Sequence, residues 1–185
     1  NKFCSMPHIM QKRRPKRPSG QLKTTGAYLN VLRSMIGHKK IRYINFAVMR
    51  SMCHPIAMAL FDSRTEPMTS FEDHERYLLE SALANPGQAM AGQDLYPTFT
   101  HKAAILYYGL VKNHPFKNGN KRTATATLLV FIAINDMELN GEKIVIENYL
   151  VELAKRVANS KGSADKDALL REIEIWLEDH LSPSV

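Results

Sequence analysis

The pattern of apolar and polar residues predicts a mostly helical domain over residues 41–181. Apolar residues recur at helical spacing in four segments, which are 46–61, 71–84, 142–158 and 163–181. Asn45 is a good N-cap residue for the first of them, and the acidic residues after Ser70 suit the first turn of the second.

Two further segments are apolar on nearly every side. They are residues 101–113, whose helix begins at Thr98 or Thr100, and residues 123–135. A helix without a polar face is usually surrounded by other helices. The sequence therefore predicts an all-α fold of about six helices around a central buried helix pair.

Three short stretches depart from the helical pattern. Residues 41–45, IRYIN, are β-branched and aromatic, which predicts one small strand. His54-Pro55 predicts a kink or interruption, because a proline disfavours helical angles in the residue before it. Residues 88–97 have Gly92 at their centre and no helical period, which indicates a hairpin-like loop.

The formal charge of +7 belongs to one end of the chain. Residues 1–40 hold ten Lys or Arg and no Asp or Glu, whereas the rest of the chain holds fifteen basic and eighteen acidic residues. We expect residues 1–25 to be a basic disordered tail, and residues 26–40 to be an extension with a short helical pattern at 26–36. Only the tail offers a surface for nucleic acid, and a solvated tail without a ligand is the interpretation we favour.

The remaining composition narrows the protein class. An apolar fraction of 44% and a charged fraction of 23% are those of a soluble globular protein. No apolar run approaches the roughly 20 residues that span a bilayer, and the basic N-terminal run lacks the apolar segment of a secretory signal. Cys4, Cys53 and the scattered histidines favour neither a disulfide nor a zinc site, so we expect a reducing cytoplasm.

The connection between the two apolar segments reads HPFKNGNKR, residues 114–122. Pro115 biases His114 away from helical angles, and Phe116 is placed to anchor the connection in the core. Residues 117–120 then form a polar turn that opens the next helix. A helix N-terminus presents unpaired N–H groups and a partial positive charge, which together favour an anion.

The side chains of this connection add to that preference. Lys121 and Arg122 put two cations at the positive end of the helix, where cations are disfavoured unless an anion is bound. Gly119 lets the backbone approach a ligand closely. His114 stands at the rim, where an imidazole can take up a proton near neutral pH. Together these residues predict a phosphate-bearing ligand.

These residues resemble the active-site signature of the Fic/Doc (death-on-curing, Fido domain) family, HPFx[D/E]GN[G/K]R. The matching residues are His114, Pro115, Phe116, Gly119, Asn120, Lys121 and Arg122. The stretches LLESALANP (78–86), GQDLYPT (92–98) and KAAILYYGLVKN (102–113) also resemble Doc-type members. The resemblance covers roughly residues 41–181 and implies the Fic/Doc fold with a small β-hairpin flap.

The resemblance also implies a chemistry, which is transfer of part of ATP onto a hydroxyl of a target protein. His114 would be the general base, and Asn120 and Arg122 would hold phosphate oxygens. Lys117, Asn118, Gly119 and Asn120 would supply backbone N–H groups to an anion nest. The flap residues that would pair with the target backbone are Ala91, Gly92, Gln93 and Asp94.

Two departures from the family pattern affect these expectations. Asn118 replaces the acidic residue that binds Mg²⁺ in the family, so Mg²⁺ should be held weakly, through an uncharged amide oxygen. Thr125 stands where many AMP-transferring members carry an Arg that pairs with an inhibitory glutamate. The Ser/Thr-x-x-x-Glu-Gly/Asn pattern of that inhibitory helix is missing, so we expect control by a separate antitoxin protein.

Lys121 separates the reaction classes that the resemblance allows. A Lys at this position matches the Doc-type arrangement, in which the γ-phosphate is delivered while Lys121 and Arg122 stabilise the phosphoryl oxygens. We therefore expect a toxin-like kinase acting on a Ser or Thr of a cytoplasmic protein, for which the resemblance suggests a translation factor. One alternative is an AMP-transferase, favoured by Gly119, where Doc itself has Ala. Another is a scaffold that only binds nucleotide or partner, favoured by Asn118.

Overall fold

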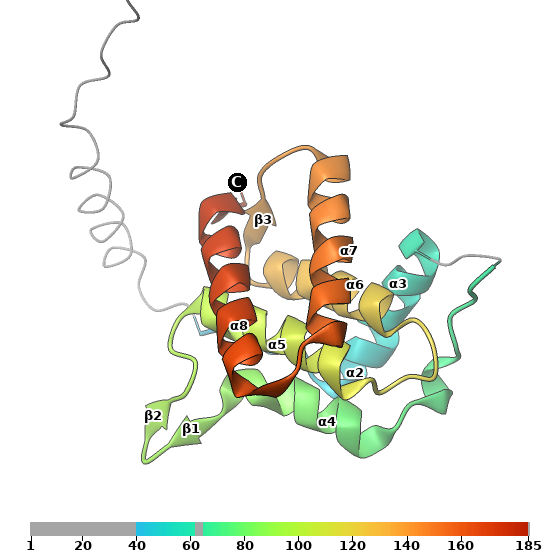
Figure 1. Ribbon diagram of the computed structural model, residues 1–185, viewed down its shortest axis with the longest axis horizontal. Helices are drawn as coiled ribbons and strands as arrows, with labels where there is room; N and C mark the ends of the chain where they lie inside the picture. The colour runs from blue at the N-terminus through green and yellow to red at the C-terminus, as the bar shows by residue number, and fades with distance from the viewer. Residues whose placement is uncertain (1–39, 62–64, 185) are drawn as a thin grey trace, which may run out of the picture. The chain divides into compact units, whose positions relative to one another are not determined.

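The computed structural model describes residues 40–61 and 65–184, and its compact unit begins at Ile41 (Figure 1). The α-helices of this part are α2 (Phe46–Val48), α3 (His54–Phe61), α4 (Arg76–Ala84), α5 (Phe99–Asn113), α6 (Asn120–Ile134), α7 (Lys143–Asn159) and α8 (Gly162–His180). The strands are β1 (Ala89–Met90), β2 (Gln93–Asp94), β3 (Met137–Leu139) and β4 (Leu181–Pro183). The predicted tail, and the extension up to residue 39, lie outside the described residues.

Helices α5 and α6 form the centre of the fold, as predicted from their apolar character. Eleven of the fifteen residues of α5 and ten of the fifteen of α6 are buried. Helix α5 contacts α4, α6, α7 and α8, and α6 contacts α3 and α7 as well. In Figure 1, α7 and α8 stand in front of this pair, α4 runs below it and α3 lies at its right-hand end. The predicted all-α fold with a central buried pair is confirmed.

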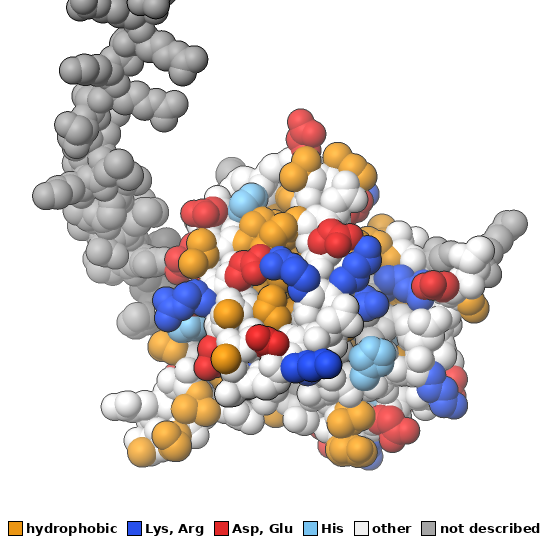
Figure 2. Space-filling view, in the orientation of Figure 1, with side chains coloured by type: hydrophobic (Ala, Val, Ile, Leu, Met, Phe, Trp, Pro, Cys, Tyr) orange, Lys and Arg blue, Asp and Glu red, His pale blue; other side chains and the backbone are white. Residues whose placement is uncertain are grey.

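The outer helices α7 and α8 are held to the centre and to each other. The Tyr107 hydroxyl in α5 donates a hydrogen bond to the Leu150 carbonyl in α7, at 2.7 Å. The rings of Tyr149 and Trp176 stack between α7 and α8 with centroids 4.6 Å apart. On the face shown in Figure 2, acidic and basic side chains are interspersed over these helices rather than gathered by sign.

The strand predicted at residues 41–45 is wrong, because a side chain takes the place of a pairing strand. The N–H of Arg42 donates to Oδ1 of Asn135, and Nδ2 of Asn135 donates to the Arg42 carbonyl, at 2.8 and 3.0 Å. Asn45 then caps the next helix as predicted, since its side chain accepts from the N–H of Val48. The run is therefore extended without forming a sheet.

The helix predicted over 46–61 is interrupted, and the one predicted over 71–84 begins late. A π-helical turn, Met49–Cys53, separates α2 from α3, which begins at His54 with Pro55 in its first turn.

In the second of these segments, residues 71–73 form a 3₁₀ turn, and the N–H of Glu75 donates to the Pro115 carbonyl at 2.7 Å. Because that bond holds residue 75 extended, α4 starts only at Arg76, and the acidic first turn expected there is not formed.

The predicted hairpin is present, and a second two-stranded ribbon was not predicted. Strands β1 and β2 pair antiparallel through a turn at Ala91 and Gly92, both of which have positive φ. Strands β3 and β4 pair antiparallel as well, and join the end of α6 to the end of α8. This second ribbon holds the C-terminal segment against the helical body.

Candidate active site

The connection between α5 and α6 reverses the chain through two left-handed residues. His114 ends α5 with φ 53° and ψ 52°, and Gly119 precedes α6 with φ 87°. Positive φ is uncommon for a residue other than glycine, and such residues cluster at functional sites. Gly119 has no side chain to cap α6, so the first N–H groups of α6 are left for a ligand.

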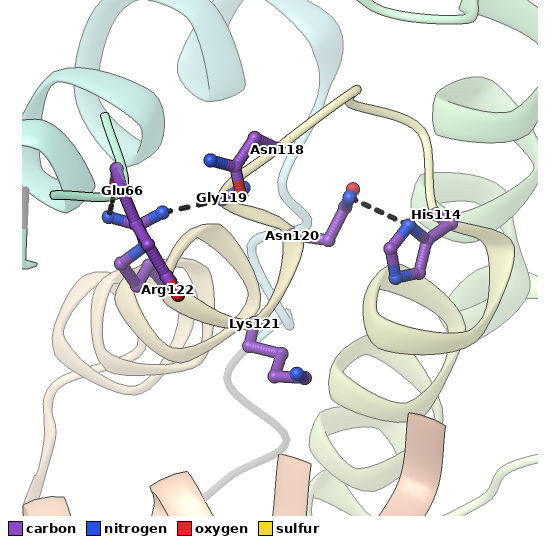
Figure 3. Close-up of a pocket in the computed structure, with 7 residues that line it drawn as sticks. All are labelled: Glu66, His114, Asn118, Gly119, Asn120, Lys121 and Arg122. Carbon is purple, nitrogen blue, oxygen red and sulfur yellow. Dashed lines mark hydrogen bonds between the residues drawn. The ribbon is translucent and has the colours of Figure 1, made fainter. Parts of the chain in front are cut away.

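A cavity of about 100 Å³ lies at this helix end (Figure 3). It is lined by Glu66, His114, Asn118, Gly119, Asn120, Lys121 and Arg122. The structure therefore brings together six of the predicted site residues and adds Glu66. Lys117, which was predicted to bind phosphate, does not line the cavity, nor do the flap residues 91–94.

Asn120 is bonded at both ends of its carboxamide. The Phe116 N–H donates to Oδ1 at 2.8 Å, while Nδ2 donates to the Phe116 carbonyl at 2.6 Å. Nδ2 also lies 3.0 Å from Nδ1 of His114. Because the Phe116 backbone fixes the orientation of the amide, Nδ2 must donate to the imidazole, and Nδ1 of His114 must accept. The proton of the neutral imidazole is therefore on Nε2.

Asn118 is also engaged through both ends of its amide. Its Oδ1 accepts from the N–H of Gly119 at 2.8 Å and lies 3.5 Å from Nη2 of Arg122. Its Nδ2 donates to the Pro67 carbonyl at 2.8 Å. An oxygen already facing two donors is a poor ligand for a hard cation. Asn118 therefore does not fit Mg²⁺ for two reasons: its side chain carries no negative charge, and its oxygen already faces two donors.

The two cations of the motif differ in their surroundings. Arg122 is half-buried, and its Nη1 donates to the carbonyls of Glu66, at 2.6 Å, and Phe61, at 3.4 Å. Lys121 is exposed, and its ammonium makes no hydrogen bond or ion pair with any residue of the described part. The Lys121 charge at an uncapped helix N-terminus favours an anionic ligand.

A second pocket of about 240 Å³ adjoins the motif cavity. Glu66, Lys121 and Arg122 line both hollows, whereas His114 lines only the motif cavity. The accessible surface of the outer pocket is mainly apolar, and its remaining lining residues are apolar Phe61, Val151 and Ala154 and polar Thr125, Glu147 and Lys155. The motif cavity is therefore the polar compartment and the outer pocket the mainly apolar one, and Lys121 and Arg122 lie between them.

The predicted flap is the β1–β2 hairpin, which is exposed along both strands. It is tied to α5 by Lys102, which is 2% exposed. Nζ of Lys102 donates to Oδ2 of Asp94 at 2.8 Å and to the Pro86 carbonyl at 3.0 Å. Burial lowers the pKa of Lys102, but the hydrogen bond to Asp94 and a contact with Tyr43 outweigh it, so the pKa is raised and the charge retained.

Sequence reasoning missed Glu66 as a residue that lines the cavity. Nothing in the spacing around Glu66 indicates a site, because the bonds that bring it to the cavity come from residues distant in sequence.

In residues 40–61 and 65–184, no three His, Cys, Asp or Glu side chains are grouped to hold a metal ion. None of the helices described has the length and apolar character needed to cross a membrane.

Comparison with known proteins agrees with this geometry. The family model described as the Fic/DOC family matches residues 36–132, which is more than half of the chain, and the protein belongs to this family. It is also 36% identical over 90 residues to the Toxin Doc of Mycolicibacterium smegmatis (strain ATCC 700084 / mc(2)155). That match covers 49% of this chain and 65% of the relative, so the chain spans less than two thirds of the relative's length. No solved structure matches this chain.

Proposed function

We propose that this protein is a Doc-type kinase that transfers the γ-phosphate of ATP to a Ser or Thr hydroxyl of a cytoplasmic protein. The observation that carries the proposal is the position of Lys121, which lines both hollows beside the uncapped start of α6. Phosphoryl transfer depends mainly on positioning and on cations at the phosphoryl oxygens. Lys121, Arg122 and the first N–H groups of α6 would supply this stabilisation.

The arrangement of the two hollows supports transfer of the terminal phosphate rather than of AMP. A nucleoside is largely apolar and suits the outer pocket, whose walls include Phe61, Val151 and Ala154. The triphosphate would then run past Lys121 into the motif cavity. Because His114 lines only that inner cavity, the phosphate nearest the imidazole would be the γ-phosphate.

The proposed step balances as an in-line displacement. The target hydroxyl oxygen forms a bond to the γ-phosphorus, the bond from that phosphorus to the β–γ bridging oxygen breaks, and ADP leaves. The hydroxyl proton passes to His114, which is exposed at the rim of the cavity. To accept this proton at Nε2, the neutral imidazole would first release its Nε2 proton to water and take up one at Nδ1, where the Asn120 amide would have to move away.

A regulatory partner follows from the same proposal. The curated relative that this chain resembles is named a toxin, and the activity of a toxin would have to be restrained in the cell that makes it. We propose a separate antitoxin protein as that partner, because the sequence lacks the inhibitory glutamate pattern of self-restrained members.

Label transfer tests the proposal directly. ATP labelled at either the α- or the γ-phosphate is incubated with the protein, Mg²⁺ and cell extract, with His114→Ala as the control. Transfer of the γ-label alone, lost in His114→Ala, is the expected result. Transfer of the α-label would indicate an AMP-transferase, which Gly119 favours. Retained ATP binding without transfer of either label would indicate a binding scaffold.

A further inference from the structure

The outer pocket, where we place the nucleoside, offers few side chains that can accept a hydrogen bond. Of the residues that line this pocket and not the motif cavity, only Thr125 and Glu147 carry a side-chain acceptor. Resting on the proposed function, we propose that Glu147 binds the two ribose hydroxyls of the nucleotide. Glu147 thereby selects a ribonucleotide over a deoxyribonucleotide.

The contacts between α5 and α7 place Glu147 on the side of the pocket away from the motif. Nζ of Lys112, at the motif end of α5, donates to the Ser160 carbonyl at 2.5 Å, so the C-terminal end of α7 lies beside the motif. Five residues earlier in α5, the Tyr107 hydroxyl donates to the Leu150 carbonyl of α7 at 2.7 Å. Glu147 precedes Leu150 in α7 and therefore lies farther still from the motif.

The charges along α7 follow the same order. Glu147, Val151 and Lys155 are four residues apart and line the pocket from one face of the helix, so Glu147 and Lys155 are about 12 Å apart along its axis. Lys155 stands toward the end of α7 beside the motif, where Lys121 and Arg122 would meet the phosphates. A carboxylate at that end would repel the phosphates. Glu147 instead faces the part of the nucleotide that lies beyond them.

The ribose diol fits a carboxylate better than the adenine edge does. An ionised carboxylate has two oxygens, and both can only accept hydrogen bonds. The neighbouring 2′ and 3′ hydroxyls supply two donors side by side, whereas adenine presents its N6 amino donor next to a ring nitrogen that accepts. Acidic side chains bind ribose hydroxyls in dinucleotide-binding folds for the same reason. The adenine ring then packs against the apolar walls formed by Phe61, Val151 and Ala154.

Thr125 is the competing acceptor, and its surroundings disfavour it. Thr125 is 6% exposed, and its hydroxyl is hydrogen-bonded to the side chain of Tyr107. The Glu147 side chain is 33% exposed, and its Oε1 lies 3.6 Å from Nζ of the exposed Lys143. An exposed ion pair of this kind contributes little to stability. Lys143 does not line the pocket, so it provides a matched control.

The test compares two nucleotides that differ only in the ribose hydroxyls. Titration calorimetry of the full chain uses ADP, the nucleotide product of the proposed reaction, and 2′,3′-dideoxy-ADP. The wild type should bind ADP at least about tenfold more tightly, as expected for hydrogen bonds to a charged group. In Glu147→Met the two nucleotides should bind equally, because the new side chain has a similar length and no oxygen. Glu147→Gln should keep part of the preference, since its amide oxygen still accepts.

Two controls separate a ribose contact from a disturbed helix. Lys143→Met removes the ion pair but leaves the carboxylate, so it should keep the wild-type preference for ADP. Dideoxy-ADP cannot use the proposed contact, so its dissociation constant should be the same for wild type and Glu147→Met. A weaker affinity for dideoxy-ADP in Glu147→Met would show that the substitution acts through the pocket's shape, which would overturn the inference.

Other results would overturn the inference while leaving nucleotide binding, and with it the proposed function, intact. These are equal binding of ADP and dideoxy-ADP by the wild type, an undiminished preference for ADP in Glu147→Met, or an equal loss of that preference in Lys143→Met. Tighter binding of GDP than of ADP that depends on Glu147 would also overturn it, because the carboxylate would then contact the base. If the wild type binds none of these nucleotides, the proposed function fails together with the inference.

Discussion

Nδ2 of Asn120 lies 3.0 Å from Nδ1 of His114, and this contact decides which imidazole nitrogen carries a proton. The amide cannot be turned around, because Oδ1 of Asn120 already accepts from the N–H of Phe116 at 2.8 Å. A neutral His114 therefore carries its proton on Nε2. A general base acting through Nε2 needs the opposite tautomer, so Asn120 keeps the imidazole in a form that cannot accept at that atom.

This relationship predicts the tautomer of the free protein. In ¹⁵N-histidine NMR spectra we expect Nδ1 of His114 to have the shift of an unprotonated nitrogen and Nε2 that of a protonated one. Asn120→Asp should reverse the assignment, because a carboxylate can only accept from Nδ1. A wild-type imidazole protonated mainly at Nδ1, or one whose tautomer does not respond to Asn120→Asp, would contradict this role of Asn120.

The left-handed position at the start of α6 predicts a steric cost for any side chain at residue 119. A Cβ on Gly119, which has φ 87°, would lie 2.9 Å from Cγ of Met68. Gly92 has a similar φ of 79° but nothing within 4 Å of such an atom. Gly92→Ala therefore measures the backbone cost alone, about 1 kcal/mol, and Gly119→Ala should lose about 1 to 3 kcal/mol more through the contact with Met68. Urea denaturation of the two variants measures both, and equal losses would show that Met68 moves aside freely.

The sequence predicted those parts of the fold that burial determines. Helices α5 and α6 were found because both are enclosed by other helices, so their apolar residues extend around the helix. The strand expected at residues 41–45 was wrong because β-propensity reports suitability for a sheet and cannot show that a partner strand is missing. Asn135, far along the chain, occupies the place of that partner.

The site could be predicted only as far as its residues are adjacent in sequence. His114 and residues 118–122 meet at one cavity because a short connection joins two packed helices. Glu66 joins them because Arg122 donates to the Glu66 carbonyl and Asn118 donates to the carbonyl of the next residue, Pro67, and no local pattern encodes these bonds. The phosphate-binding role expected for Asn120 stays a prediction, and its amide is bonded to protein groups in this structure.

The buried ion pair beneath the hairpin predicts a coupling between the flap and α5. Asp94 is half-exposed, but Nζ of Lys102 is buried and depends on Asp94 for its counter-charge. Asp94→Asn should lower the free energy of unfolding by about 1 to 3 kcal/mol, because the buried Lys102 ammonium loses its counter-charge and is left with a neutral acceptor. It should also reduce hydrogen-exchange protection of the hairpin. If the hairpin positions the target, the KM for the target should rise while nucleotide affinity stays the same.

Two controls separate these effects for the hairpin. Asp94→Glu keeps the charge and should restore part of both the stability and the KM. The double variant Lys102→Met with Asp94→Asn removes the unpaired cation and should be more stable than Asp94→Asn alone. The single variant Lys102→Met is measured as well. If the double variant loses as much stability as Asp94→Asn and Lys102→Met together, the two side chains are not coupled.

A buried histidine behind the motif predicts how stability depends on pH. His54 is 3% exposed, and its ring centroid lies 5.2 Å from that of Phe116, the apolar anchor of the connection. Nε2 of His54 donates to the Thr69 carbonyl at 3.0 Å. Burial lowers the pKa of His54 below its ordinary value of 6.5. The bond to Thr69 opposes this shift, and repulsion from His74 adds to it.

The folded protein therefore binds a proton at His54 less readily than the unfolded chain does. As the pH falls below 6.5, the unfolded state takes up the proton first, so the free energy of unfolding falls until the lower pKa of the folded state is passed. His54→Gln can still donate to the Thr69 carbonyl but cannot titrate, so it should flatten this part of the pH dependence. Urea denaturation at about pH 7.5 and about pH 5 measures the difference. If wild type and variant lose the same stability between these two values, the acid sensitivity lies in other groups, and His54 does not link protonation to the packing of Phe116.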